Sequence, residues 1–285
     1  MKNTVVTLAE MKARGEKISQ LTCYDYTTAR LMDQCGINTI LVGDSLGMTM
    51  QGYADTIPVT MEEMIVYGRS VCRACENAFV VLDMPFMSYQ VSVEQAVANA
   101  GRLMKECGAN AVKLEGGKEV CDQIRAITAS GIPVCAHIGL TPQSHNCLGG
   151  FKVQGKGEAE ARRLLENAAA VEAAGAFMVV LECVPPKLAA LVTQKTSMIT
   201  IGIGAGNGCD GQVLVWQDMM GMGDWKPKFA RTFGQVGQAF QDACRAYDQE
   251  VKAGTFPSPQ ESFVKSDCSD EFLTQLYGGN PGGNR

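Results

Sequence analysis

FVVLDMP, residues 79–85, is a short run of β-branched and apolar residues that ends on an acid and a Pro-containing turn. Such a run is typical of a strand that is buried on both faces. Six further segments share the pattern: ISQLTCYD (18–25), NTILVGDS (38–45), NAVKLEG (110–116), IPVCAHIG (132–139), FMVVLECV (177–184) and MITIGIG (198–204). Helical stretches separate these runs, and this alternation predicts a parallel sheet covered by helices.

Capping signals mark the ends of the helical stretches. Thr60 with Glu63, and Ser92 with Gln95, have the spacing of a capping box at a helix start. Three glycines follow helical stretches at positions where a left-handed residue is expected: Gly36, Gly108 and Gly175. The helices therefore fit between the predicted strands.

The part of the chain after Gly204 decides the architecture. We predict a helical GQVLVWQDMMG (211–221), a weak eighth strand near 225–233 and a last helix from about 235 to 253. Eight such units predict an α/β fold, a (β/α)₈ TIM barrel in a single domain spanning 1–264. The alternative, a doubly wound open sheet, usually has fewer strands and needs a switch point that sequence does not display. Residues 265–285 are polar and rich in Gly and Asn, which predicts a mobile tail.

Composition limits the possible partners. The chain has 285 residues, 46% of them hydrophobic, and a net charge of -5, so it offers no long-range attraction for nucleic acid or an anionic membrane. The N-terminus lacks the apolar core of a signal peptide, and no apolar run approaches the ~20 residues of a transmembrane helix. The twelve cysteines are scattered through strand-like and helix-like segments, which is typical of a reducing compartment and predicts a cytoplasmic location.

Polar residues occur near the ends of the predicted strands. The set comprises Asp25, Asp44, Asp83, Glu115, His137 and Glu182. A barrel gathers its strand ends on one face, and in barrel enzymes the carboxyl-terminal face is catalytic. These side chains are therefore expected to converge across one cavity.

Asp83 and Glu182 lie within apolar runs, where an unpaired carboxylate is costly and normally acquires a cation or a proton. Several acids without a Cys/His cluster favour Mg²⁺ over zinc. Lys113 lies two residues before Glu115, so on a strand both side chains point to the same face, and Lys113 can bind an anionic substrate in the same cavity. The alternative is that each acid caps the next helix or pairs with a cation at the rim. Capping explains a single acid better than it explains the set.

Two other motifs carry less weight. Cys72 and Cys75 form a CxxC inside a helical stretch, with no second pair to complete a zinc site. Gly206, Gly208 and Gly211 match GxGxxG, but too little chain remains for a dinucleotide-binding half, so these glycines indicate either a backbone approach to a ligand or a tight turn.

LGGFKVQGKGE (148–158) follows the fifth strand and is long and polar for a barrel loop, which suits a lid; a passive surface loop is the alternative. Lys152, Lys156 and Arg162 are candidates to attract an anionic tail. His137 is either a donor to a substrate oxygen or a structural histidine, and His145 is expected in a loop.

These residues stand in segments that resemble the ketopantoate hydroxymethyltransferase family, in family order over roughly residues 3–258. The matching segments are LTCYDYTTARL, LVGDSLGMTMQGY, LDMPFMSY, VKLEGG, HIGLTPQS, GGFKVQGKG, LECVP and IGIGAGNGCDGQVLV. Only the tail beyond about residue 264 departs from the family pattern, and it carries none of these residues.

The resemblance implies a role for each acid. It implies that Asp44 and Asp83 ligate one Mg²⁺ with Glu115 in support, that Asp44, Ser45, Asp83 and Lys113 bind a keto acid, and that Glu182 is the proton acceptor. It further implies a cytoplasmic homodecamer that transfers a hydroxymethyl group from 5,10-methylenetetrahydrofolate to 3-methyl-2-oxobutanoate. In that reaction the bound Mg²⁺ stabilises an enolate of the keto acid, and the products are 2-dehydropantoate and tetrahydrofolate, on the way to pantothenate.

Two alternatives remain at this point. One is a related Mg²⁺-dependent keto-acid enzyme, a carbon–carbon lyase or a phosphoenolpyruvate mutase, although the Lys-Cys-Gly-like loop of such lyases is not found in the sequence. The other is a binding barrel without catalysis, which would have no need of the acids.

Overall fold

The computed structural model describes residues 2–223, 225–263 and 265–276. The chain divides into two compact units, Met1–Gly234 and Gln235–Arg285. The first unit contains every strand. The second contains α11 (Val236–Ala253) and α12 (Asp270–Leu276).

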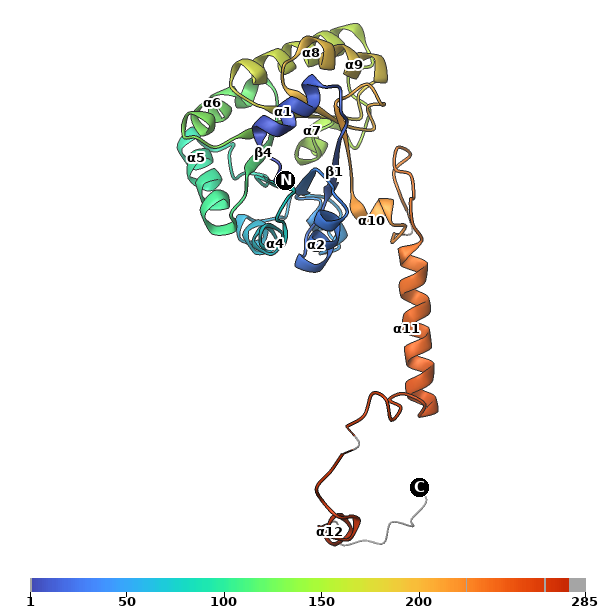
Figure 1. Cartoon of the computed structure of the whole chain (residues 1–285). Coiled ribbons are helices and arrows are strands. Elements are labelled where there is room, and N and C mark those ends of the chain that lie inside the picture. The colour runs from blue at the N-terminus through green and yellow to red at the C-terminus, as the bar shows by residue number, and fades with distance from the viewer. Residues whose placement is uncertain (1, 224, 264, 277–285) are drawn as a thin grey trace. The chain divides into compact units, whose positions relative to one another are not determined.

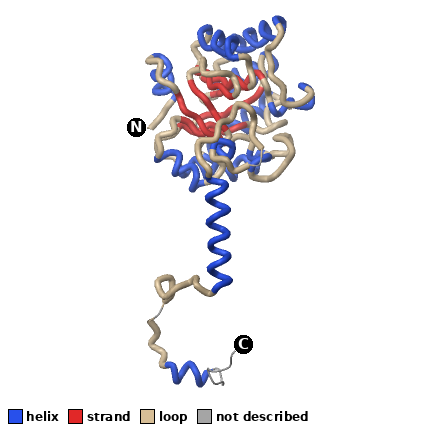
Figure 2. Tube along the Cα trace, turned by 90° about the vertical axis from the view of Figure 1, so that its right-hand side faces the viewer, coloured by secondary structure: helices blue, strands red, loops and turns tan. Residues whose placement is uncertain are grey.

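Eight parallel strands close into a barrel in which β1 pairs with both β2 and β8. The strands are β1 Ile18–Thr22, β2 Thr39–Val42, β3 Phe79–Asp83, β4 Ala111–Glu115, β5 Val134–Gly139, β6 Met178–Glu182, β7 Ile199–Ile203 and β8 Gly211–Leu214. In Figures 1 and 2 the strands lie inside a surround of helices. The predicted (β/α)₈ barrel is confirmed, and the seven clear strands are found at their predicted places.

A helix or helical turn follows each strand except β7, which leads directly to β8, and α1 precedes β1. They are α1 Val5–Ala13, α2 Tyr26–Gln34, α3 Leu46–Thr49, α4 Met61–Ala74, α5 Val93–Arg102, the π-helical η1 Leu103–Cys107, the 3₁₀ turn η2 Lys118–Val120, α6 Cys121–Ala129, the 3₁₀ turn η3 Pro142–Ser144, α7 His145–Leu148, α8 Glu158–Ala173, α9 Pro186–Lys195 and α10 Trp216–Met219. The predicted last helix is confirmed as α11. The domain boundary expected at residue 264 stays a prediction; α12 lies within the expected tail, and residues 277–285 are outside the described residues.

The capping predictions are confirmed in most details. Thr60 and Glu63 form a reciprocal capping box at the start of α4. The Ser92 hydroxyl accepts the backbone N–H of Gln95, which caps α5 from one side only. The three predicted helix-ending glycines adopt positive φ: Gly36, Gly108 and Gly175.

The eighth strand corrects the prediction. Residues 211–214 form β8, not a helix, and residues 225–233 contain neither strand nor helix. The reason is the alternation along β8, where Gly211 and Val213 are buried and Gln212 is exposed. A side chain at Gly211 would meet the carbonyl oxygen of Ile18 on β1, so close strand pairing requires glycine there.

The apolar core has two layers, because side chains alternate across each strand. On β3, Val80 and Leu82 join the cluster between sheet and helices, whereas Phe79 and Val81 join the cluster inside the barrel. Leu8 of α1 is fully buried in the inner cluster, where it closes the amino-terminal end. Asp83 lies two residues after Val81 on β3, so its side chain faces the barrel interior as those of Phe79 and Val81 do. It does so at the carboxyl-terminal end of the barrel, opposite to Leu8.

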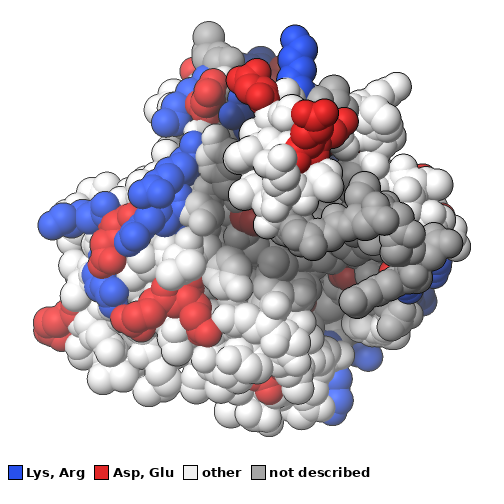
Figure 3. All heavy atoms as spheres, turned by 90° about the horizontal axis from the view of Figure 1, so that it is seen from below, with Lys and Arg blue, Asp and Glu red and all other residues white. Residues whose placement is uncertain are grey.

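The described helices are too short or too polar to cross a bilayer. On the face drawn in Figure 3, Lys and Arg side chains are interspersed with Asp and Glu.

Candidate active site

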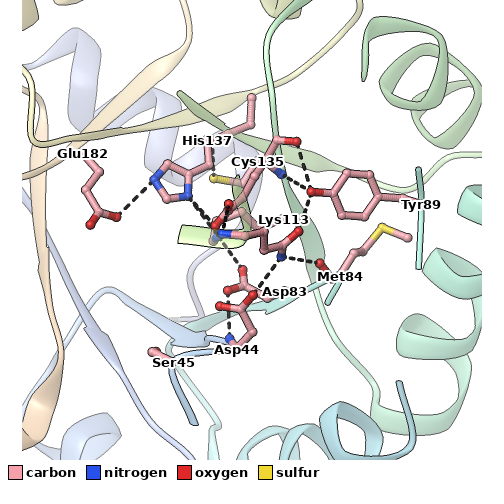
Figure 4. A network of polar contacts seen from close by, with 12 residues as sticks. Asp44, Ser45, Asp83, Met84, Tyr89, Lys113, Cys135, His137 and Glu182 are labelled. Atoms are coloured by element: carbon pink, nitrogen blue, oxygen red, sulfur yellow. Dashed lines mark hydrogen bonds and ion pairs between the residues drawn. The ribbon is translucent and has the colours of Figure 1, made fainter. Parts of the chain in front are cut away.

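The carboxyl ends of the strands hold the predicted residues. Asp83, Glu115 and Glu182 are the last residues of β3, β4 and β6, Asp44 follows β2 by two residues, and His137 lies on β5. Asp44, Asp83, Lys113, Glu115 and His137 are all buried, and Glu182 is partly exposed. These residues occupy positions whose side chains face the barrel interior, so acids that are far apart in sequence lie together (Figure 4).

Lys113 is the central cation of this group. Its Nζ lies 2.8 Å from Asp83 Oδ1 and 4.0 Å from Glu115 Oε1. The other oxygen of Asp83, Oδ2, accepts the backbone N–H of Asp44 at 3.0 Å. The predicted inward direction of Lys113 is thus observed, and Asp83 connects β2 to β4.

His137 lies between two acids. Its Nδ1 is 3.2 Å from Glu115 Oε1, and its Nε2 is 3.2 Å from Glu182 Oε2. In Figure 4 the carboxylate of Glu182 points toward the imidazole ring. His137 therefore links the partly exposed Glu182 to the buried cluster.

Burial and mutual repulsion set the protonation of the acids. Burial raises the pKa of Asp44 well above its usual range, and the charges of Asp83 and Glu115 raise it further. Burial also raises the pKa of Asp83, against the opposing effect of Lys113. The pKa of Glu115 is lowered, because His137 and Lys113 outweigh its burial.

The neighbouring carboxylates raise the pKa of both bases of the cluster. Burial lowers the pKa of Lys113, but the three neighbouring carboxylates raise it by more, so the net shift is upward. Burial and Lys113 lower the pKa of His137, and Glu115 with Glu182 raises it to about 9.

The donor set fits a hard divalent cation. Asp44 and Asp83 offer carboxylate oxygens, and the raised pKa of Asp44 marks a position where positive charge would stabilise the carboxylate. Within the described residues, no three His, Cys, Asp or Glu side chains already form a complete metal cage. Mg²⁺ needs no such cage, since it commonly takes one or two carboxylates and keeps waters or substrate oxygens.

Two buried residues of the network were not predicted from the sequence: Tyr89 and Gln143. The Gln143 amide donates to Asp44 Oδ2 at 2.8 Å, and its backbone N–H donates to Glu115 Oε2 at 3.0 Å. Both residues lie in loops after strands, where no periodic pattern indicates which side chains face inward. The polar TPQS segment directly after β5 was the only sequence signal for Gln143.

Other predicted candidates are found outside the cluster. Asp25 caps α2 by accepting the backbone N–H of Thr28 at 2.8 Å, so the capping alternative holds for this acid. Ser45 is half-buried, and its hydroxyl is 2.8 Å from the hydroxyl of Tyr24. The prediction of a loop at His145 is wrong: this residue begins the short helix α7, and its ring stacks on that of Phe151 with the centroids 5.6 Å apart.

The cysteine and glycine motifs show no cofactor arrangement. All twelve cysteines lie in described residues and are free, Cys72 and Cys75 among them. The GxGxxG glycines connect β7 directly to β8, whereas a dinucleotide fingerprint leads from a strand into a helix.

A closed parallel barrel with buried acids and a lysine at its carboxyl end is the arrangement of a (β/α)₈-barrel enzyme. The model of the family described as ketopantoate hydroxymethyltransferase matches residues 2–259. The chain belongs to this family and is a transferase.

The chain is also similar to curated relatives over their whole length. The chain is 61% identical to the 3-methyl-2-oxobutanoate hydroxymethyltransferase of Clostridium novyi (strain NT), over 97% of this chain and 100% of the relative. It is 57% identical to the enzyme of that name from Enterococcus faecalis (strain ATCC 700802 / V583), with the same coverage.

Among solved structures, a phosphoenolpyruvate phosphomutase from Streptomyces platensis subsp. rosaceus superposes with a TM-score of 0.61. The superposition covers 97% of this chain and 96% of the phosphomutase chain, and the two sequences are 15% identical. This likeness shows a shared fold only.

Proposed function

We propose that this protein transfers a hydroxymethyl group from 5,10-methylenetetrahydrofolate to 3-methyl-2-oxobutanoate, giving 2-dehydropantoate and tetrahydrofolate for pantothenate synthesis. The observation that carries the proposal is the buried group of Asp44, Asp83 and Glu115 around Lys113, in a chain of this family. A small anionic substrate and a cation together would complement this mixture of charges.

Asp44 and Asp83 would hold Mg²⁺, with Glu115 supporting the site from β4. When bound, the ion would draw electron density from the keto group and make the neighbouring C–H bond more acidic. Lys113 would attract the substrate carboxylate, and Ser45 would donate a hydrogen bond to it from the loop after β2.

Glu182 would accept the proton from C3 of the keto acid. Its carboxylate is partly exposed, unlike the other acids, so it is accessible to a substrate that lies above the cluster. His137, whose Nε2 is 3.2 Å from this carboxylate, would hold its orientation. The resulting carbanion at C3 would form a bond to the methylene carbon of the folate, whose two C–N bonds would break. Water would supply the hydroxyl group, and the proton from C3 and one from water would end on the two folate nitrogens, which releases tetrahydrofolate.

The segment 149–157, between α7 and α8, would act as a lid. Lys152 and Lys156 are exposed on it, and Gln154 anchors it by donating its backbone N–H to the carbonyl of Cys183 at 2.9 Å. The two lysines, with Arg162 on α8, would attract the carboxylate tail of the folate.

A cytoplasmic homodecamer is part of the same proposal. The helix α11 carries exposed apolar side chains at helical spacing, namely Val236, Phe240, Tyr247 and Val251. An exposed apolar stripe on a long helix supports assembly with other subunits. Light scattering during gel filtration would measure the assembly mass in multiples of the 30.5 kDa chain.

One assay tests the reaction. The purified protein is incubated with the keto acid in heavy water, with and without Mg²⁺ and the folate. We expect Mg²⁺-dependent deuterium exchange at C3, and 2-dehydropantoate only when the folate is present. Cleavage of a carbon–carbon bond would indicate a lyase, and neither exchange nor product would indicate a binding barrel.

A further inference from the structure

The side chain of Gln143 is a buried amide with a full set of partners. It lies in η3, directly after β5, and its Nε2 donates to Asp44 Oδ2 at 2.8 Å and to the carbonyl of Met84 at 3.0 Å. Its Oε1 is 2.7 Å from the hydroxyl of Tyr89. Both amide hydrogens and the oxygen therefore have partners within the protein, which holds this side chain in place.

Tyr89 and Gln90 both present a donor to the oxygen of this amide. The Tyr89 hydroxyl accepts the backbone N–H of Glu115 at 3.1 Å, and its proton has two acceptors, Gln143 Oε1 at 2.7 Å and the carbonyl of Glu115 at 3.1 Å, of which Gln143 is the nearer. Gln90 Nε2 lies 3.4 Å from the same Oε1. A flipped amide would turn its oxygen toward the carbonyl of Met84 and the carboxylate of Asp44, both of which are acceptors. One orientation is therefore satisfied, and in it the donors face Asp44.

Gln143 also reaches the second acid through its backbone. Its N–H donates to Glu115 Oε2 at 3.0 Å, while Glu115 Oε1 faces His137. One residue thus contacts one oxygen of Asp44, which follows β2, and one oxygen of Glu115, which ends β4. The other oxygen of Asp44, Oδ1, accepts no hydrogen bond from the residues that the structure describes.

We propose that Gln143, oriented by Tyr89, is a positioning residue that holds Asp44 ready for the divalent cation. The inference rests on the proposed function for the role of Asp44. Neutral donors behind a ligating carboxylate fix its direction, and their loss typically lowers metal affinity about 10–100-fold. The loop after β5 therefore contributes to a site whose acids come from other strands.

The test measures binding of Mg²⁺ alone, by calorimetry on the full chain without substrate. Gln143→Leu and the length-matched Gln143→Met remove the donors to Asp44, and we expect Mg²⁺ affinity to fall about 10–100-fold. Tyr89→Phe keeps the amide but removes the shorter of the two hydrogen bonds to its oxygen, and we expect a smaller loss in the same direction. The matched control is Gln123→Leu on α6, a partly buried amide that donates to the carbonyl of Tyr89 and, among the described residues, makes no hydrogen bond to a carboxylate; it should bind Mg²⁺ normally.

A second measurement separates positioning from a merely structural role. For a positioning residue, the rate that Gln143→Met loses at low Mg²⁺ should return at saturating Mg²⁺. Gln143→Met or Tyr89→Phe with wild-type Mg²⁺ affinity and a native melting curve would overturn this inference alone. Failure of the unaltered protein to bind Mg²⁺ would overturn the proposed metal site together with it.

Discussion

The ammonium of Lys113 lies 2.8 Å from the carboxylate of Asp83, and both side chains are almost completely excluded from water. This pair comes from adjacent strands, β3 and β4, which align the two residues directly opposite each other. The pair is also surrounded by further acids, so removal of the lysine leaves negative charge with little compensation.

Lys113→Met keeps most of the aliphatic stem and removes the charge. We expect a loss of about 3–5 kcal/mol in the free energy of unfolding, because breaking a buried pair leaves an uncompensated charge. Urea unfolding measures the change. The control Lys118→Met breaks the exposed pair with Glu166 and should cost no more than about 1 kcal/mol; equal losses in both variants would contradict the argument.

Glu182→Gln removes the proposed base without changing its size. We expect the variant to bind Mg²⁺ and the keto acid normally, and to lose C3 deuterium exchange by a factor of about 10²–10⁴. Glu158→Gln, at the exposed start of α8, is the control. Near-normal exchange in Glu182→Gln would exclude this residue as the base.

The raised pKa of His137 leads us to expect that the stability of the metal-free protein depends on pH. Its pKa of about 9 in the folded protein lies above the unfolded value near 6.5. Its stabilising contribution is therefore complete below about pH 6.5 and is lost as the pH rises through 9, with a total of at most about 3 kcal/mol. Urea unfolding at several pH values should show this decline in the wild type and a flatter profile in His137→Gln. Parallel profiles would show that another group is responsible.

Lys152→Ala and Lys156→Ala test the folate-tail hypothesis. Each substitution is expected to raise the KM for the folate roughly 2- to 5-fold, because an ion pair at the surface is screened by solvent and contributes little to binding. The KM for the keto acid should stay unchanged. Added salt should reduce the difference from wild type. Lys105→Ala, exposed on η1, is the control. An unchanged folate KM in both variants would remove these lysines from the site.

The sequence predicts the barrel and most of the acid cluster because both depend on local patterns. Strand periodicity places Asp83 and Glu115 at strand ends, and the rule that one barrel face collects those ends brings them together. The eighth strand was missed because GQVLV alternates over only four strand residues, too few to separate from a helical pattern. Gln143 and Tyr89 were missed for a different reason: their inward direction depends on loop conformation, which is set by tertiary contacts.

The helix α1, with Leu8 in the inner core, closes one end of the barrel, so in the part of the chain that the structure describes the buried acids are approached from the carboxyl end. In the proposed reaction the keto acid would therefore reach the acids before the folate binds above it, and its product would leave after tetrahydrofolate. We therefore expect compulsory-order kinetics, with the keto acid first on and 2-dehydropantoate last off. Product-inhibition patterns would reveal this order, and random addition would contradict it.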